Sequence, residues 1–463
     1  MHKNFKFALK VGFGFRPSEF LPEDGLGWAQ EQLELESYNS TLPELIVKNH
    51  KNILERSDYI LKDRALHIRS LAIEKNEARR MGKSTKAFRN SEIELSVADN
   101  IRHALNAIYG ENQVNQRFVH FWMNHFTVGS VGYTAVLQAD YEKEAIAKNL
   151  KGNFSEMLFD AITHPSMLKY LDNIHNIGPN SKTKSGSNDS DGLNDNLARE
   201  VLELHTVTPA VEYTEADIHE MAKILTGWGF KIDTEKEYGL KLINKTKDLR
   251  KPFVAENSEP GKSNLLGKRV SNFKKGLREM LEHLARHPAT VSACCKKLLG
   301  HFVSDNPKQE HIEQLVDVWT VNDGYLPAVH SKVLEIAFNT DEVKLNWPST
   351  WAYQMSRTHG GIIKITGDRK ARDILMDLGM SFWSVRQPNG YSSKSSDWIS
   401  QEYLDRRLRY VNFSLWNSRD FQRIEEIATR MKIDGRTLEA IKSNDNTYER
   451  LAILYCSPDF MFV

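Results

Sequence analysis

The sequence predicts a mainly α-helical, multi-helix globular body with one small β-hairpin insertion. Three observations support this fold class. Apolar residues recur at spacings of three and four over most of the chain, which is the period of an amphipathic helix. Short alternating runs between turn residues are confined to about 230–262. The length of 463 residues, of which 40% are apolar and 27% charged, suits one large helical body or several structural units.

Four parts are expected along the chain. Residues 1–110 should form N-terminal helices, and residues 111–228 a central helical core that holds the candidate site. Residues 229–268 should form the hairpin insertion, and residues 269–463 a C-terminal helical part packed on the core. These boundaries follow the places where the periodicity of the apolar residues changes.

Local signals place individual helices and one loop. Aromatic side chains at helical spacing mark 111–126. Thr214, with Asp217 three positions later, is suited to cap the next helix, which should end at Gly227. The polar stretch 178–192 is the clearest loop, and loops longer than about 12–15 residues are often either functional lids or disordered. A functional site next to it would use it as a lid.

Charge, cysteine content and hydropathy argue against several classes of protein. The 62 basic and 61 acidic residues leave a net charge of +1, which is no electrostatic footprint for nucleic acid. Three cysteines are too few for a disulfide framework. No apolar run is long enough to span a bilayer, and Lys6 and Lys10 interrupt any secretory signal segment. On sequence alone we expect a soluble, cytoplasmic protein.

The segment NDNLAREVLELHT (194–206) carries an unusual density of polar side chains. On an ideal helix these form one polar stripe, whereas His205 falls on the apolar side, as a core or helix-end residue would. The stripe consists of Asn196, Arg199, Glu200 and Glu203. Two glutamates on one face can bind a metal or act as an acid/base pair. Alternatively, Arg199–Glu203 and Asn196–Glu200 are i,i+4 pairs that only stabilise the helix.

The aromatic helix offers a base for the same site. His125 projects from the aromatic face, among Phe118, Phe121 and Trp122, whereas His120 points to the opposite side and is expected to be exposed. An imidazole on an aromatic face needs a hydrogen-bond partner. That partner is either the carboxylate stripe or a backbone carbonyl, and the sequence does not choose between them.

Five ordered blocks resemble a large bacterial family, domain of unknown function 1800. The resemblance runs from KVGFGFRPSEF to LAILYCSPDFMF, nearly the whole chain. The blocks are RFVHFWMNHFTV, GNFSEMLFDAITHPSMLKYLDN, GLNDNLAREVLELHT, YTEADIHEMAKILTGW and HPATVSACCKKLLGHFVSD. The family pattern falls on Asn124 and His125, and on Asn194, Asn196, Ala198, Arg199, Glu200 and Glu203. The resemblance implies no established activity. It does imply export, and a partner encoded nearby that is similar to sulfatases and alkaline phosphatases, which suggests work on an envelope or extracellular glycan.

The chain departs from the family pattern in several places. Asn257 and Ser258 stand nearest to the usual His-Asp pair. Thr208 replaces the glycine after the ELHT block, and Gly390–Tyr391 stands for a Gly-Trp pair. The chain also lacks the export signal that is usual in the family. If the His-Asp pair is catalytic in relatives, the activity of this chain is lost or altered.

The leading hypothesis is an enzyme-like site where the 111–126 and 194–205 helices meet, hydrolysing an envelope glycan or its substituents. Glu200 and Glu203 would be acid/base groups or ligands of a divalent metal, and His125 a second base or ligand. Arg199 would hold an anionic group, and Asn196 would orient the substrate, with Asn124 beside His125. The alternative is a non-catalytic helical scaffold or binding protein with a buried polar network. The sequence leaves open whether the protein is an enzyme.

Overall fold

The computed structural model describes residues 2–38, 41–57, 70, 73–84, 86–129, 134–184, 193–208, 212–230, 251–360, 377–380, 385, 387–414 and 421–463. These residues form many short helices and a two-stranded antiparallel sheet, which confirms the predicted fold class. No helix within these ranges is both long and apolar enough to cross a membrane.

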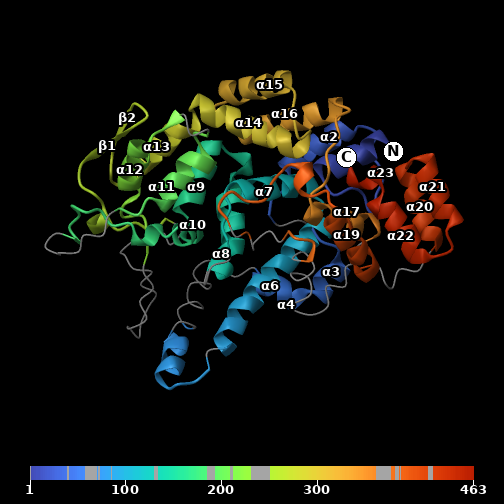
Figure 1. Cartoon of the computed structure of the whole chain (residues 1–463), viewed down its shortest axis with the longest axis horizontal. Coiled ribbons are helices and arrows are strands. Elements are labelled where there is room, and N and C mark those ends of the chain that lie inside the picture. Colours follow the sequence, from blue (N-terminus) through green and yellow to red (C-terminus); the bar gives the residue numbers. More distant parts are fainter. Residues whose placement is uncertain are drawn as a thin grey trace.

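The N-terminal half of the chain begins beside its C-terminal end and then passes through the centre of the molecule (Figure 1). Its elements are α1 (Lys3–Val11), α2 (Gly25–Glu31), η1 (Gln32–Glu34), α3 (Glu44–Asn49), α4 (Lys51–Ser57), α6 (Lys86–Tyr109), α7 (Gln113–His125), α8 (Thr134–Asp140), η2 (Tyr141–Ile146), η3 (Ala147–Lys151), α9 (Phe154–Thr163), α10 (Pro165–Tyr170), η4 (Asn173–His175), α11 (Asn196–Glu200), η5 (Val201–His205) and α12 (Glu215–Leu225).

The C-terminal half covers α7 with helices and ends in a cluster of short helices at the far side of the molecule (Figure 1). Its elements are η7 (Ala255–Asn257), β1 (Lys262–Leu265), β2 (Lys268–Ser271), α13 (Lys274–Ala285), α14 (Pro288–Phe302), α15 (Gln309–Val321), α16 (Leu326–Asn339), α17 (Pro348–Thr358), η8 (Ser395–Asp397), α19 (Gln401–Ser414), α20 (Phe421–Met431), α21 (Gly435–Ser443), α22 (Thr447–Cys456) and α23 (Pro458–Met461).

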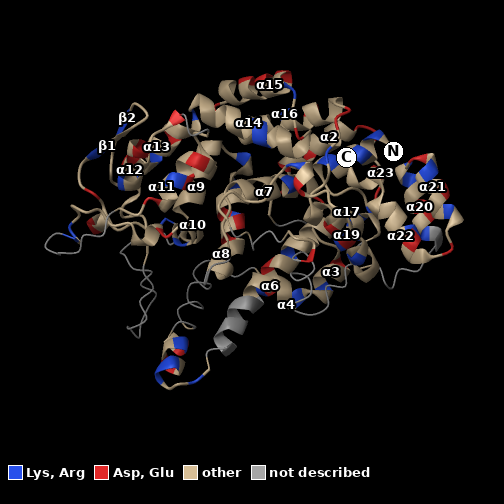
Figure 2. Ribbon diagram, in the orientation of Figure 1, with Lys and Arg blue, Asp and Glu red and all other residues tan. Residues whose placement is uncertain are grey.

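Several helix starts follow from local sequence. Thr214 and Asp217 form a reciprocal capping box at the start of α12, as expected. The two His-Pro pairs start α10 and α14, where proline suits the first turn and the preceding histidine ring accepts a backbone N–H. Acidic and basic residues are interspersed along most helices, in keeping with the near-neutral net charge (Figure 2).

The β-hairpin exists but lies later than expected. Its strands pair from Lys262↔Ser271 to Leu265↔Lys268, whereas the sequence indicated 230–262, of which 231–250 lie outside the described residues. Leu266 and Gly267 form the two-residue turn, both at positive φ. The turn was missed because leucine is seldom found in this conformation.

One prediction about α7 is wrong. His120 is fully buried and stacks on His103 with 4.3 Å between ring centroids, although the sequence predicted exposure. A helical wheel distinguishes two faces, but α7 lies in the middle of the molecule and is covered on both (Figure 1). Polar residues on its second face are therefore core residues.

Candidate functional site

His125 lies at the end of α7 in an aromatic surround, as the periodicity indicated. Its ring stacks on Phe121 and meets Trp122 and Phe126 edge-on. Only 8% of the residue is exposed. Burial, followed by the charge of Lys297, lowers the pKa of His125 well below its usual value, so the ring is neutral near pH 7.

The partner of His125 is a backbone carbonyl. Nε2 lies 3.2 Å from the His205 oxygen. Because a carbonyl only accepts, Nε2 carries the proton and Nδ1 is left as an acceptor. Nδ1 has no hydrogen-bond partner within the described ranges, and His125 forms no ion pair with Glu200 or Glu203 there. The structure therefore favours the backbone alternative of the two left open by the sequence.

The helix that supplies this carbonyl is not a regular α-helix. After one α-helical turn, α11 continues as the π-helical turn η5, which holds an extra residue per turn. Two threonine hydroxyls satisfy carbonyls that the wide turn frees: Thr206 Oγ1 donates to Val201 (2.7 Å) and Thr208 Oγ1 to Glu203 (2.6 Å). The angles expected for an ideal α-helix over 193–205 therefore do not apply beyond Glu200.

Lys297 of α14 caps the same helix end. Its Nζ donates to the Leu204 carbonyl at 2.8 Å, next to the carbonyl that His125 binds. The negative end of a helix dipole favours a cation here. Burial nevertheless lowers the pKa of Lys297. Two adjacent carbonyls of η5 are therefore bound from two different helices. The imidazole of His125 comes from α7 and the ammonium group of Lys297 from α14.

Asn124 holds the loop that passes over this junction. Its side chain binds the backbone of Tyr391 in both directions, donating to the carbonyl at 2.9 Å and accepting from the N–H at 2.8 Å. Gly390 has φ +70°, and a Cβ there would lie 2.6 Å from the Asn124 carbonyl oxygen. Glycine is therefore required at position 390.

A pocket of about 190 Å³ lies between these elements. Its walls are aromatic or aliphatic, with amides, hydroxyls and basic groups between them. The lining residues are Phe121, Asn124, His125, Leu204, Lys297, His301, Trp347, Pro388, Asn389, Tyr391, Ser392 and Ser393. Apolar walls with a few convergent polar groups are typical of ligand sites. The pocket contains two of the predicted site residues, Asn124 and His125.

His301 lies four residues after Lys297 in the same pocket wall. Arg117 Nη2 is 3.5 Å from its Nε2, and because arginine only donates, Nε2 accepts and Nδ1 carries the proton. Nδ1 has no partner among the residues that the structure describes. His301 is 6% exposed, and burial lowers its pKa well below the usual value.

The acidic stripe lies outside the pocket. Arg199 binds Glu215 twice at 3.0 Å, Glu203 at 3.3 Å and Asp195 at 3.2 Å, all through side chains that are at least one-third exposed. The Arg199–Glu203 pair is the i,i+4 contact that the structural alternative predicted.

Glu200, which follows Arg199 in α11, has a raised pKa. It is partly buried, and burial followed by the charge of Glu203 raises its pKa. Burial and Glu200 in turn raise the pKa of Tyr170 to about 12. Asn196 is exposed, and its backbone N–H binds Asn194 Oδ1 at 3.2 Å. None of these residues lines the pocket.

The described residues contain no group of three or more His, Cys, Asp or Glu side chains suited to hold a metal ion. A metal-ligand role for His125, Glu200 and Glu203 has no support among these residues and stays a prediction.

The described part of the predicted lid, 178–184, does not line the pocket. Residues 185–192 lie outside the described residues, but 178–184 binds the segment before the hairpin. Asn180 donates to Glu259, and Thr183 Oγ1 donates to Asn257 Oδ1 at 2.6 Å. Ser258 is buried and donates to the Thr226 carbonyl at 3.4 Å. Asn257 and Ser258, the positions nearest to the His-Asp pair that the family resemblance implies, thus join two segments. The loop over the pocket is 387–393.

Sequence reasoning missed Lys297 and His301, although a signal was present. Cys294, Lys297 and His301 lie at i, i+3 and i+7, which places a lysine on the buried face of α14. A lysine among the apolar residues of a helix face is costly to bury, so this pattern could have indicated a functional residue.

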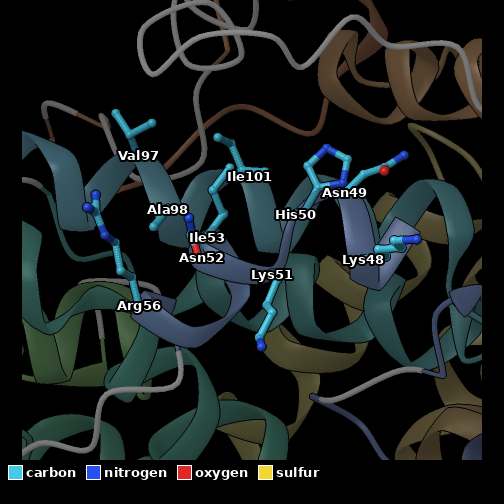
Figure 3. A pocket seen from close by; sticks show the side chains of 10 residues that line it. All are labelled: Lys48, Asn49, His50, Lys51, Asn52, Ile53, Arg56, Val97, Ala98 and Ile101. Carbon is cyan, nitrogen blue, oxygen red and sulfur yellow. The ribbon is translucent and has the colours of Figure 1, made fainter. Parts of the chain in front are cut away.

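A second pocket, of about 540 Å³, lies between the α3–α4 segment and α6 (Figure 3). Its polar residues, such as Lys48, Lys51 and Arg56, are exposed. In Figure 3 the Lys51 side chain extends away from Val97 and Ile101. No predicted site residue lines it, so the smaller pocket is the candidate site.

Fold and site together define a mainly α-helical protein with a small pocket at a helix junction. The chain belongs to the family described as protein of unknown function (DUF1800), whose model matches residues 6–462. No curated protein and no solved structure matched the chain.

Proposed function

We propose that this chain binds a small polar ligand in the pocket beside His125 and hydrolyses a glycan or one of its substituents there. The observation that carries the proposal is the state of His125. Its Nε2–H is held by the His205 carbonyl, its buried Nδ1 has no partner within the described ranges, and the residue is one of those that line the pocket. An oriented neutral imidazole with one acceptor nitrogen is the usual form of a general base.

The chemistry of the walls supports a sugar-like ligand. Phe121, Trp347 and Tyr391 provide aromatic surfaces, and the amides and hydroxyls of Asn124, Asn389 and the two serines provide hydrogen bonds. The volume is below the roughly 300–1,000 Å³ of pockets for drug-sized ligands. One sugar unit or one substituent is therefore the part of a glycan that enters.

Hydrolysis of an ester substituent illustrates what the groups would do. A water oxygen bonds to the acyl carbon while its proton passes to His125 Nδ1, and Lys297 stabilises the negative charge on the acyl oxygen. The ester C–O bond then breaks, and the leaving sugar oxygen takes the proton back from Nδ1. The products are a free sugar hydroxyl and an acid.

The alternative, a non-catalytic scaffold, is favoured by the ion pairs of Arg199. Exposed i,i+4 pairs on α11 stabilise the helix without any reaction. We therefore place no catalytic role on Glu203 or Arg199, and the two proposals differ in what they require of His125.

The test is turnover of a panel of 4-nitrophenyl esters and glycosides by the full chain and two variants. His125→Gln keeps a donor for the His205 carbonyl but removes the basic Nδ1, because an amide cannot take up a proton near neutral pH. We expect it to fold and to lose roughly 10²–10⁴-fold in kcat/KM, the usual contribution of a general base. Glu200→Gln should keep turnover near that of the unmodified chain. Equal turnover in His125→Gln, or no turnover of any substrate, would reject hydrolysis at this pocket.

A further inference from the structure

The positive charge around the pocket is not balanced by the described residues. Lys297 forms no ion pair with a carboxylate among them, and no acidic residue lines the pocket. Lys344, whose charge also lowers the pKa of His301, pairs with Asp305. Lys297 is partly buried, and withdrawing a cation from water without an anionic partner is costly. The Leu204 carbonyl compensates Lys297 in part, but it uses one of three ammonium donors.

His301 adds a second donor. Arg117 binds Nε2 of the ring, so the proton stays on Nδ1. Arg117 is itself buried, and among the described residues it has no carboxylate partner. The charge therefore fixes the tautomer of His301 without cancelling the positive potential of the pocket.

His125 has the opposite character. All three residues line the pocket, and the His125 nitrogen that has no partner among the described residues is an acceptor, whereas Lys297 and His301 carry donors. A ligand that satisfies all three groups needs an acceptor-rich anionic end and an adjacent donor such as a hydroxyl.

We propose that the pocket recognises a ligand by an anionic group, a carboxylate, sulfate or phosphate, bound between Lys297 and His301, with a neighbouring hydroxyl donated to His125 Nδ1. The inference rests on the proposed function, since it names the class of ligand that the same pocket takes. It restricts the glycan to one that carries an acid or an acidic substituent.

The experiment measures binding of four probes to the full chain by calorimetry and thermal unfolding. The probes are acetate, inorganic sulfate, inorganic phosphate and neutral glucose. At least one anion should bind and raise Tm, and each probe identifies a different source of the charge. Sulfate and phosphate also stabilise proteins by exclusion from the surface, so only a shift that depends on the pocket residues counts.

Variants of α14 supply that dependence. Lys297→Met and His301→Leu should each weaken anion binding roughly ten- to hundredfold, the effect of a lost hydrogen bond to a charged group. Lys296→Met removes the exposed neighbouring charge and should leave binding unchanged. Lys297→Arg keeps the charge, and His301→Asn keeps a donor near the position of Nδ1. Both should retain most of the affinity even if the first two variants fold poorly.

The outcomes separate this inference from the proposed function. Equal anion binding in Lys297→Met and Lys296→Met, or no anion binding at all, overturns the inference. Glucose binding without anion binding also overturns it, but leaves the proposed function standing. Anion binding that requires Lys297, together with no turnover of the 4-nitrophenyl panel, supports the inference and rejects hydrolysis.

Discussion

The two ends of the 196–205 segment use charge in opposite ways. At the N-terminal end Arg199 meets three carboxylates, all on exposed or half-buried side chains. At the C-terminal end Lys297 and His125 bind two backbone carbonyls beside the pocket, and no carboxylate among the described residues pairs with either of them. The charges around Arg199 are paired and screened by solvent, so they contribute little to the free energy of unfolding. Lys297 and His125 have no carboxylate partner in the part of the chain that the structure describes, and a ligand could bind to them.

The largest expected effect that distinguishes the two ends is loss of stability in mild acid. Burial lowers the pKa of His205 and His330 to about 3, and it lowers the pKa of His125 well below its usual value. Between about 6.5 and 3 the unfolded chain binds protons that the folded chain does not, so stability falls as pH falls. Each such histidine costs up to about 1.4 kcal/mol per pH unit.

Urea unfolding at pH 7, 6, 5 and 4 measures this loss. His330→Gln should make the decline shallower, whereas the same change at exposed His219 should not. Protonation of Glu215, whose pKa is lowered by Arg199, would act only below its usual pKa. Stability that is constant down to pH 5 would therefore mean that the buried histidines do not control the acid limit.

The second effect concerns His125 and Glu200. His125→Ala removes the donor to the His205 carbonyl and leaves a cavity among aromatic rings, which should cost about 2–4 kcal/mol. His125→Gln should recover part of that loss. Glu200→Ala removes a partly buried carboxylate whose pKa is raised, so the change should be below about 1 kcal/mol. Similar losses from His125→Ala and Glu200→Ala in a thermal scan would show that the two ends form one network.

The smallest effect is expected at Arg199. Its pairs are exposed, so Arg199→Ala should lower the free energy of unfolding by less than about 1 kcal/mol. High salt should reduce the difference further because it screens exposed charges. Unfolding at about 0.05 and 1 M NaCl compares the two conditions. A larger, salt-independent loss would assign a structural role to this arginine that its exposure does not suggest.

Helical periodicity predicted the fold class and the surroundings of His125 because both depend on local spacing. The aromatic face of α7 follows directly from the positions of Phe121, Trp122 and His125. Burial of His120 could not be predicted in the same way, because it depends on helices far away in sequence that cover the second face.

Of the site, the sequence predicted Asn124 and His125 as members but not what they contact. The partner of Asn124 is 267 residues away, and that of His125 is 80 residues away. The wide turn at 201–205 has no local signature that we can identify, yet it decides which carbonyls reach the pocket. Roles for Glu200 and Glu203 in catalysis remain predictions.

Because of the π turn, a one-residue deletion could reorient the C-terminal end of the 196–205 segment without moving its N-terminal end. A π turn contains one residue more than an α turn, and each residue of a helix turns the chain by about 100°. Deleting one residue within 201–205 would leave Arg199, Asp195 and Glu215 in phase with α12 but would rotate the last two carbonyls away from the ammonium and the imidazole that bind them. The extra residue of the π turn thus sets the orientation of the Leu204 and His205 carbonyls relative to Arg199.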